Sequence, residues 1–480
     1  MSTVSPSADR RMSVRAVGVL LVVCGALFLE GIDIAMLNVA VPDIAADIGL
    51  GTGAAHWVIS AFVLGYAGFM LLGGRSADIF GRRRVFLLAL LAFLVFSGLG
   101  GLATEPWMLI VARFVTGVSA GFMTPAGFSI VTSSFPEGPL RTRALTIYGA
   151  VGAGGFVLGM VAGGLLTTVN WRWVFFAPMA MSALLLVAGH LLIRGDESSR
   201  SRSTFDVGGA VTATVGMVAL IYALVTLGES RDVRAGAIAM VVAVVAVTAF
   251  VLIESRSPAP LVRLSLLRRG LLPLASTAGL LFMAGFFAFQ FTITLYLQDL
   301  RGWTPLETGL TFAVMGIDLV LAPIFTPGLV ERFGNLRVMT AGLTSAAAAF
   351  LLALRLQADW AYVDLLPSLL LVAVAFALVY GPLTSAATGC LDESEHGVAG
   401  GVVYTGFQLG AALGLALVTV VLVGDHSATA SSDDYQRALA VPTAFAVLSV
   451  LVGIVAVVRT RVRGGSADGS VQAPQLQCDV

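Results

Sequence analysis

Long apolar runs, separated by short charged or glycine- and proline-rich joints, follow one another along the whole chain. A helix rises about 1.5 Å per residue, so about 20 apolar residues cross a bilayer core of about 30 Å. Fourteen runs reach this length, and we expect an all-α integral membrane protein with fourteen transmembrane helices. The runs lie at 16–41, 54–73, 85–103, 107–134, 143–168, 173–193, 207–227, 235–253, 271–297, 308–330, 338–356, 361–387, 397–423 and 439–458.

Composition agrees with a membrane protein and excludes several other classes. The chain has 480 residues, of which 58% are hydrophobic and 12% are charged, which no soluble domain of this size matches. The first apolar run is too long for a signal-peptide core and carries two acids, so we expect it to be retained. The cysteines are scattered and show no disulfide framework or metal-ligand spacing, so we expect no metal: Cys24, Cys390 and Cys478.

The arginines predict the orientation of the helices. Every basic residue is an arginine, and with the N-terminus inside, 21 of the 28 fall on cytoplasmic segments. Six fall outside, and Arg113 lies within a span. Positive residues favour the cytoplasmic side. We therefore expect a multi-pass protein of the cell membrane with both termini in the cytoplasm.

Two motifs recur at nearly equal distances. Gly155-Phe156-Val157-Leu158-Gly159 with Gly163 returns 251 residues later as Gly406-Phe407-Gln408-Leu409-Gly410 with Gly414. The segment 77–85 returns more weakly at 330–338. Equal offsets indicate duplication, and parallel repeats with a site at their interface are one plan of secondary transporters. We expect two six-helix pseudo-repeats with two inserted helices. The predicted divisions are 1–14 (cytoplasmic tail), 15–194 (first bundle), 195–270 (loops and inserted helices), 271–459 (second bundle) and 460–480 (cytoplasmic tail).

Two carboxylic acids lie on one face of the first predicted helix. Glu30 and Asp33 are three residues apart, near the middle of the bilayer. A charge at that depth costs about 2.5–3.5 kcal/mol on insertion scales, which marks both as functional candidates. As like charges in a low dielectric, we expect them to titrate as a coupled pair.

Arg113 is a candidate partner for Asp33. It lies eight residues from Glu105, about 12 Å below the outer surface, and Asp33 lies ten residues from Asp43, about 15 Å down. We expect the two to pair or share water, with Arg113 helping Asp33 to release a proton. A purely structural ion pair is the alternative. Asp318 lies near the midplane of the tenth span, and burial there suits an acid that loads a proton or a cationic substrate.

The segment Gly74-Arg75-Ser76-Ala77-Asp78-Ile79-Phe80-Gly81-Arg82-Arg83-Arg84 joins the second and third spans. Its pattern resembles the signature loop of the major facilitator superfamily, with Val85 at the last basic position. In that family the loop is a conformational latch between the halves. The resemblance implies a gating role for Gly74, Asp78, Gly81, Arg82, Arg83 and Arg84.

Further motifs narrow the resemblance. Asp33-Ile34-Ala35-Met36-Leu37-Asn38-Val39-Ala40-Val41-Pro42 looks like the first-helix motif of the drug:proton antiporter-2 family, which has fourteen spans. Leu109 with Arg113 and Gly117 resembles its fourth-helix motif. The fifth helix has Gly159-Met160 where the family usually has Gly-Pro, although close helix packing alone also explains its glycines.

Polar residues in otherwise apolar spans are candidates for a substrate cavity. Such groups also bond between helices, which is the alternative for at least half of them. They are Asn38, Gln290, Tyr296, Tyr380, Tyr404 and Gln408.

The energy source follows from what the sequence lacks. Without lysine there is no Gly-x-x-x-x-Gly-Lys-[Ser/Thr] motif, so we expect no bound cofactor and a proton gradient as the driving force. We predict a monomeric exporter of hydrophobic or cationic small molecules, not an enzyme, whose partners are substrate, protons and lipid bilayer, with no nucleic acid. A proton-coupled nutrient importer is one alternative. A membrane-embedded enzyme or sensor is another, and it would need a catalytic cluster that the sequence does not show.

Overall fold

A computed structural model describes residues 13–50, 57–135, 139–194, 207–228, 233–257, 269–389, 391, 396–423 and 431–464. All regular elements within these ranges are helical. The first six long helices are α1 (Val14–Ile48), α3 (Trp57–Phe80), α4 (Arg82–Gly101), α5 (Pro106–Ser134), α6 (Pro139–Val169) and α7 (Trp173–Leu192).

The next elements are the two helices predicted as an insertion and the second group of long helices. The second group contains two irregular segments, a π-helical turn (η2) and a 3-10 turn (η3). In order they are α8 (Val207–Gly228), α9 (Val233–Glu254), α10 (Leu272–Leu295), η2 (Tyr296–Leu300), α11 (Pro305–Ala313), η3 (Val314–Ile317), α12 (Asp318–Phe333), α13 (Asn335–Ala353), α14 (Tyr362–Thr388), α15 (His396–Val423) and α16 (Ser432–Gly464).

The helices match the predicted apolar runs closely. Within the described ranges, eleven helical stretches are long and apolar enough to cross a membrane. The predicted spans 54–73, 143–168 and 207–227 fall on α3, α6 and α8, where the apolar stretches found are shorter. The multi-pass helical fold is therefore confirmed, and the count of fourteen spans stays a prediction.

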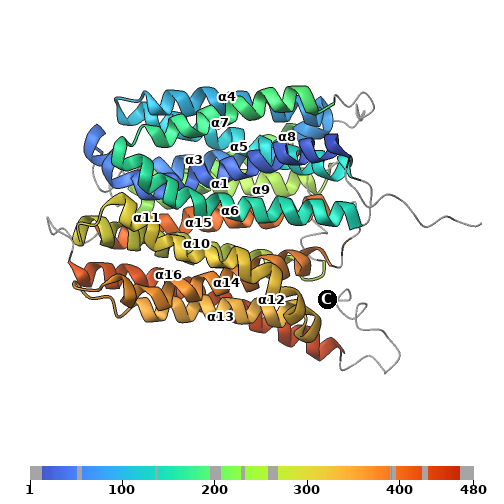
Figure 1. The fold of residues 1–480 in the computed structure, drawn as a ribbon. Coiled ribbons are helices and arrows are strands. Elements are labelled where there is room, and N and C mark those ends of the chain that lie inside the picture. The colour runs from blue at the N-terminus through green and yellow to red at the C-terminus, as the bar shows by residue number, and fades with distance from the viewer. Residues whose placement is uncertain are drawn as a thin grey trace, which may run out of the picture.

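The long helices lie side by side, with the helices of the first group above those of the second in the view of Figure 1. The pair α8 and α9 pack on each other, and α8 also contacts α3 and α15, one helix from each group. The inserted helices thus touch both halves. We call the end of the bundle at which α1 begins and α16 ends the inner end, and the opposite end the outer end.

The duplicated glycine motif packs in the same way in both copies. A Cβ atom at Gly155, Gly159 or Gly163 of α6 would collide with the backbone of α1 at Phe28, Ile32 and Met36 respectively. In the second copy, Gly410 and Gly414 of α15 lie equally close to the backbone of α10 at Leu280 and Ala284, and Gly406 lies slightly farther from Ser276. Glycine permits this close approach of helices in a membrane.

The structure differs from the sequence prediction at two places. The first apolar run ends at residue 41, before Pro42, but α1 continues through this proline to Ile48. Residues 74–80 are not a loop but the last turns of α3, and only Gly81 separates α3 from α4. Its φ of 93° suits glycine, and Gly334, with a φ of 81°, separates α12 from α13 at the equivalent place in the repeat.

Candidate functional site

A buried ion pair joins α1 to α5. Arg113 Nη1 donates to Asp33 Oδ2 over 2.6 Å, and the two side chains are 1% and 0% exposed. The contact predicted from helix depth is therefore present. Asp33 Oδ1 has no hydrogen-bond partner among the described residues. Asp33 Oδ1 can therefore bind a proton or accept a hydrogen bond while Oδ2 faces Arg113.

The guanidinium of Arg113 is also fixed by α3. Its Nε donates to the backbone oxygen of Val58 over 3.1 Å, and its Cζ lies 4.5 Å from the centre of the Phe62 ring. Helices α3 and α5 touch here, since a Cβ on Gly117 would lie 2.0 Å from the Phe62 backbone oxygen. The close seam holds the arginine in position to face Asp33.

Glu30 has different partners. Its Oε2 accepts from the Tyr66 hydroxyl of α3 over 2.9 Å and lies 2.7 Å from the Thr124 hydroxyl of α5. Glu30 is 3% exposed. Sequence reasoning missed Tyr66 and Thr124, although each is a polar side chain in an apolar helix. The two acids of α1, expected to act as a coupled pair, are thus held by separate groups.

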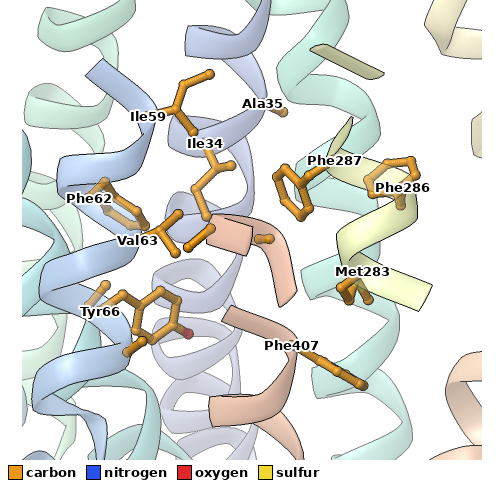
Figure 2. Packing of buried hydrophobic residues seen from close by; sticks show 14 of the residues in the cluster. Ile34, Ala35, Ile59, Phe62, Val63, Tyr66, Met283, Phe286, Phe287 and Phe407 are labelled. Carbon is orange, nitrogen blue, oxygen red and sulfur yellow. The ribbon is translucent and has the colours of Figure 1, made fainter. Parts of the chain in front are cut away.

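The two acids lie beside a layer of apolar side chains between the halves. Figure 2 shows Phe62 and Tyr66 along α3 and Ile34 on the neighbouring α1, with Phe286 and Phe287 of α10 across the interface. Phe156 of α6 meets Phe286 and Phe287, with ring centres 5.7 and 6.1 Å apart. Aromatic side chains from both halves therefore meet at this interface.

Asp318, the remaining predicted acid, occupies a break in a helix of the second half. The 3-10 turn η3 ends there and α12 begins, and the side chain is partly exposed. Its Oδ1 has no partner among the described residues. No described hydrogen bond or ion pair joins it to the Asp33 pair. The structure therefore leaves Asp318 as an independent acid.

The polar cavity candidates have different surroundings. Gln290 is buried and its Nε2 lies 3.2 Å from Met160 Sδ of the other half. Asn38 donates to the Ile34 backbone oxygen within α1, over 3.0 Å. Tyr296 is fully buried and donates to the Gln357 backbone oxygen over 2.6 Å, which does not fit a role in lining a cavity.

Two tyrosines of the second half form a pair. The hydroxyls of Tyr380 and Tyr404 are hydrogen-bonded to each other, and both rings lie against Phe407. Gln408 of α15 is partly exposed. The two tyrosines thus form one polar pair between α14 and α15.

The two ends of the interface differ. At the outer end the halves touch: Gln298 Nε2 donates to the Val39 backbone oxygen over 3.0 Å, and a Cβ on Gly164 would lie 2.6 Å from the Pro305 backbone oxygen. At the inner end, a Cβ on Gly381, Gly400 or Gly401 would meet nothing within 4 Å. The two halves are thus in direct contact at the outer end, and these three glycines near the inner end have no close neighbour among the described residues.

The predicted gating motif lies at this inner end. Arg82 reaches the Ser129 backbone oxygen of α5 over 3.4 Å, and Arg83 donates to the His190 backbone oxygen of α7 over 2.9 Å. Gly74 is helical, and Arg84 is exposed. The side chain of Asp78 lies outside the described part of the chain. The described arginine contacts therefore tie α4 to helices of its own half.

Comparison with solved structures supports the fold. The POT family transporter PepTSo aligns over 95% of this chain and 99% of its own, with a TM-score of 0.69 at 18% identity. At this identity the likeness shows the arrangement of helices and no more.

Sequence relatives and a family model show to which protein family the chain belongs. The puromycin resistance protein pur8 of Streptomyces alboniger is 33% identical, covering 94% of this chain and 92% of its own. The cephamycin export protein CmcT of Amycolatopsis lactamdurans is 33% identical, covering 84% of each chain. The model of the Major Facilitator Superfamily matches residues 23–415. These matches confirm the predicted resemblance and the expectation of a transporter rather than an enzyme, and the chain belongs to the Major Facilitator Superfamily.

Proposed function

We propose that this protein exports hydrophobic or cationic small molecules from the cell in exchange for protons, by alternating access. The observation that carries the proposal is the buried Asp33–Arg113 pair between α1 and α5. A buried ion pair is costly, and within a membrane such groups mark ion and substrate pathways. The relatives named for puromycin resistance and cephamycin export support the direction of transport and a small-molecule cargo.

The ion pair supplies a means of coupling. A proton that reaches Asp33 neutralises the carboxylate and removes its attraction for Arg113, which then keeps its contacts with Val58 and Phe62. Helix α1 packs on α6, and α6 contacts α11 of the other half. A change in the α1–α5 contact can therefore reach the surface on which the two halves move.

Proposals about the topology follow from the positive-inside pattern. With fourteen spans and both termini in the cytoplasm of a cell-membrane protein, the inner end of the bundle faces the cytoplasm. The contact of Gln298 with Val39 then closes the outer side, and substrate enters from the cytoplasmic side. This is the conformation from which an exporter loads its cargo.

Transport by the purified protein in proteoliposomes tests the proposal. A pH gradient is imposed and the movement of ethidium, a lipophilic cation, and of puromycin is followed together with internal pH. We expect each substrate to move against the direction of proton flow. Movement in the same direction as protons would identify the importer, and gradient-independent binding without transport would contradict both.

A further inference from the structure

The oxygen atoms around Glu30 make more close contacts than the two hydroxyl protons can fill when the carboxyl group is ionised. Glu30 Oε2, Tyr66 Oη and Thr124 Oγ1 form a triangle with sides of 2.9, 2.7 and 2.7 Å. Thr124 Oγ1 also lies 3.0 Å from the Ala120 backbone oxygen. Each hydroxyl has one proton to donate, so an ionised Glu30 leaves two protons for these four contacts.

A protonated Glu30 fits these contacts better. The carboxyl O–H of Glu30 then donates a hydrogen bond to the Thr124 hydroxyl, and Thr124 donates to the Ala120 backbone oxygen. The Tyr66 hydroxyl donates to Glu30 Oε2. Two oxygens held 2.7 Å apart without a proton between them repel each other, so each added proton stabilises the cluster. The other carboxyl oxygen, Oε1, has no partner among the described residues, which a neutral carbonyl tolerates better than a carboxylate does.

The charged and titratable surroundings agree. The groups that act on Glu30 from α3 and α5 are the Tyr66 and Thr124 hydroxyls, and the group on its own helix is Asp33. Tyr148 of α6 and Tyr404 of α15 interact with it from further helices. None of these groups is positively charged. Asp33, by contrast, has Arg113 at 2.6 Å.

We propose that Glu30, Tyr66 and Thr124 form a second proton-binding site, separate from the Asp33–Arg113 pair. In the conformation described here, Glu30 holds a proton and Asp33 does not. The binding site itself does not depend on transport. Its use rests on the proposed function: two separate acids on α1 let the protein move two protons in each cycle.

Infrared spectroscopy of the reconstituted protein tests the site without any substrate, through the carbonyl band of protonated carboxyl groups. We expect Glu30→Gln to remove one such band at neutral pH and Asp33→Asn to leave that band in place. Tyr66→Phe removes a donor and shifts the band. Tyr296→Phe is the matched control, because that hydroxyl is also buried but binds Gln357, and it leaves the band unchanged.

The opposite results overturn the proposal. A spectrum unchanged by Glu30→Gln means that Glu30 is ionised, and a band lost in Asp33→Asn means that the proton is on the other acid. If Glu30→Gln does not fold, Tyr66→Phe decides, since an unshifted band contradicts the network. Where ethidium transport is found, the proton-to-ethidium ratio from reversal potentials is expected to halve in Glu30→Gln. An unchanged ratio rejects the second transported proton while leaving the export proposal standing.

Discussion

Arg113 and Asp33 lie 80 residues apart in the sequence and meet at 2.6 Å in the centre of the first helical half. The contact is almost fully buried, and the arginine is held by Val58 and Phe62 as well as by its acid. This pair connects two helices of one half while facing a third, α3. It is the part of the structure on which the proposed coupling depends.

Removing the arginine alone is expected to destabilise the protein. Arg113→Gln leaves the Asp33 carboxylate buried without its cation, and breaking a buried pair in this way costs about 3–5 kcal/mol. Thermal unfolding in detergent measures the loss. The double variant Asp33→Asn with Arg113→Gln removes both charges and should recover most of the stability. If the loss of stability in the double variant equals the sum of the losses in the two single variants, the two side chains do not interact as described.

The close seam between α3 and α5 predicts a large difference between two glycine substitutions. Gly117→Ala places a methyl group 2.0 Å from the Phe62 backbone oxygen, so the helices must separate. Overpacking of this kind costs about 1–3 kcal/mol. Gly401→Ala is the control, because the added methyl group meets nothing within 4 Å. The melting temperature should fall in Gly117→Ala and stay unchanged in Gly401→Ala. The same change in both variants would show that α3 and α5 pack less closely than described.

Asp318 is expected to act on substrates and not on coupling. It lies at the start of α12, with Oδ1 unpartnered and no described contact with the Asp33 pair. Asp318→Asn should therefore reduce transport of ethidium, a cation, much more than transport of a neutral substrate. Proteoliposome uptake of both compounds measures the difference. An equal loss for both, together with loss of proton movement, would instead place Asp318 in the coupling machinery.

The span count has its own test. If α8 and α9 both cross the membrane, the connection between them faces the opposite side from the segment that precedes α8. In a variant without native cysteines, Ser230→Cys should react with an impermeant maleimide from outside intact cells. Ser201→Cys should react only after the cells are opened. Labelling of both positions from the same side would show that α8 and α9 do not each cross the membrane.

Much of the fold follows from hydrophobicity alone, since each apolar run falls on a helix or, for 308–330, on two helices joined by a 3-10 turn. The Asp33–Arg113 contact also follows, because helical rise places both at nearly the same depth. The extension of α1 through Pro42 and the helical end of α3 at 74–80 do not follow from the apolar runs, which end at residues 41 and 73. Helices in a membrane tolerate both residues when neighbouring groups satisfy the backbone.

The surroundings of Glu30 could not be predicted in the same way. Depth arithmetic places side chains along the membrane normal and says nothing of which helices are neighbours. Tyr66 and Thr124 reach Glu30 because α3 and α5 meet backbone to backbone near Gly117 and Gly121. That closeness is a property of packing, and only the structure shows it.

Gradient-driven transport by Asp33→Asn tests the central claim most directly. In proteoliposomes with an imposed pH gradient, the wild type should accumulate ethidium against its concentration gradient while protons move the other way. Asp33→Asn should keep ethidium counterflow, which needs no proton, and lose gradient-driven accumulation, because Asp33 and not Glu30 is paired with Arg113. Accumulation by Asp33→Asn at the wild-type level would contradict the account, because the buried pair with Arg113 would then be only a structural contact.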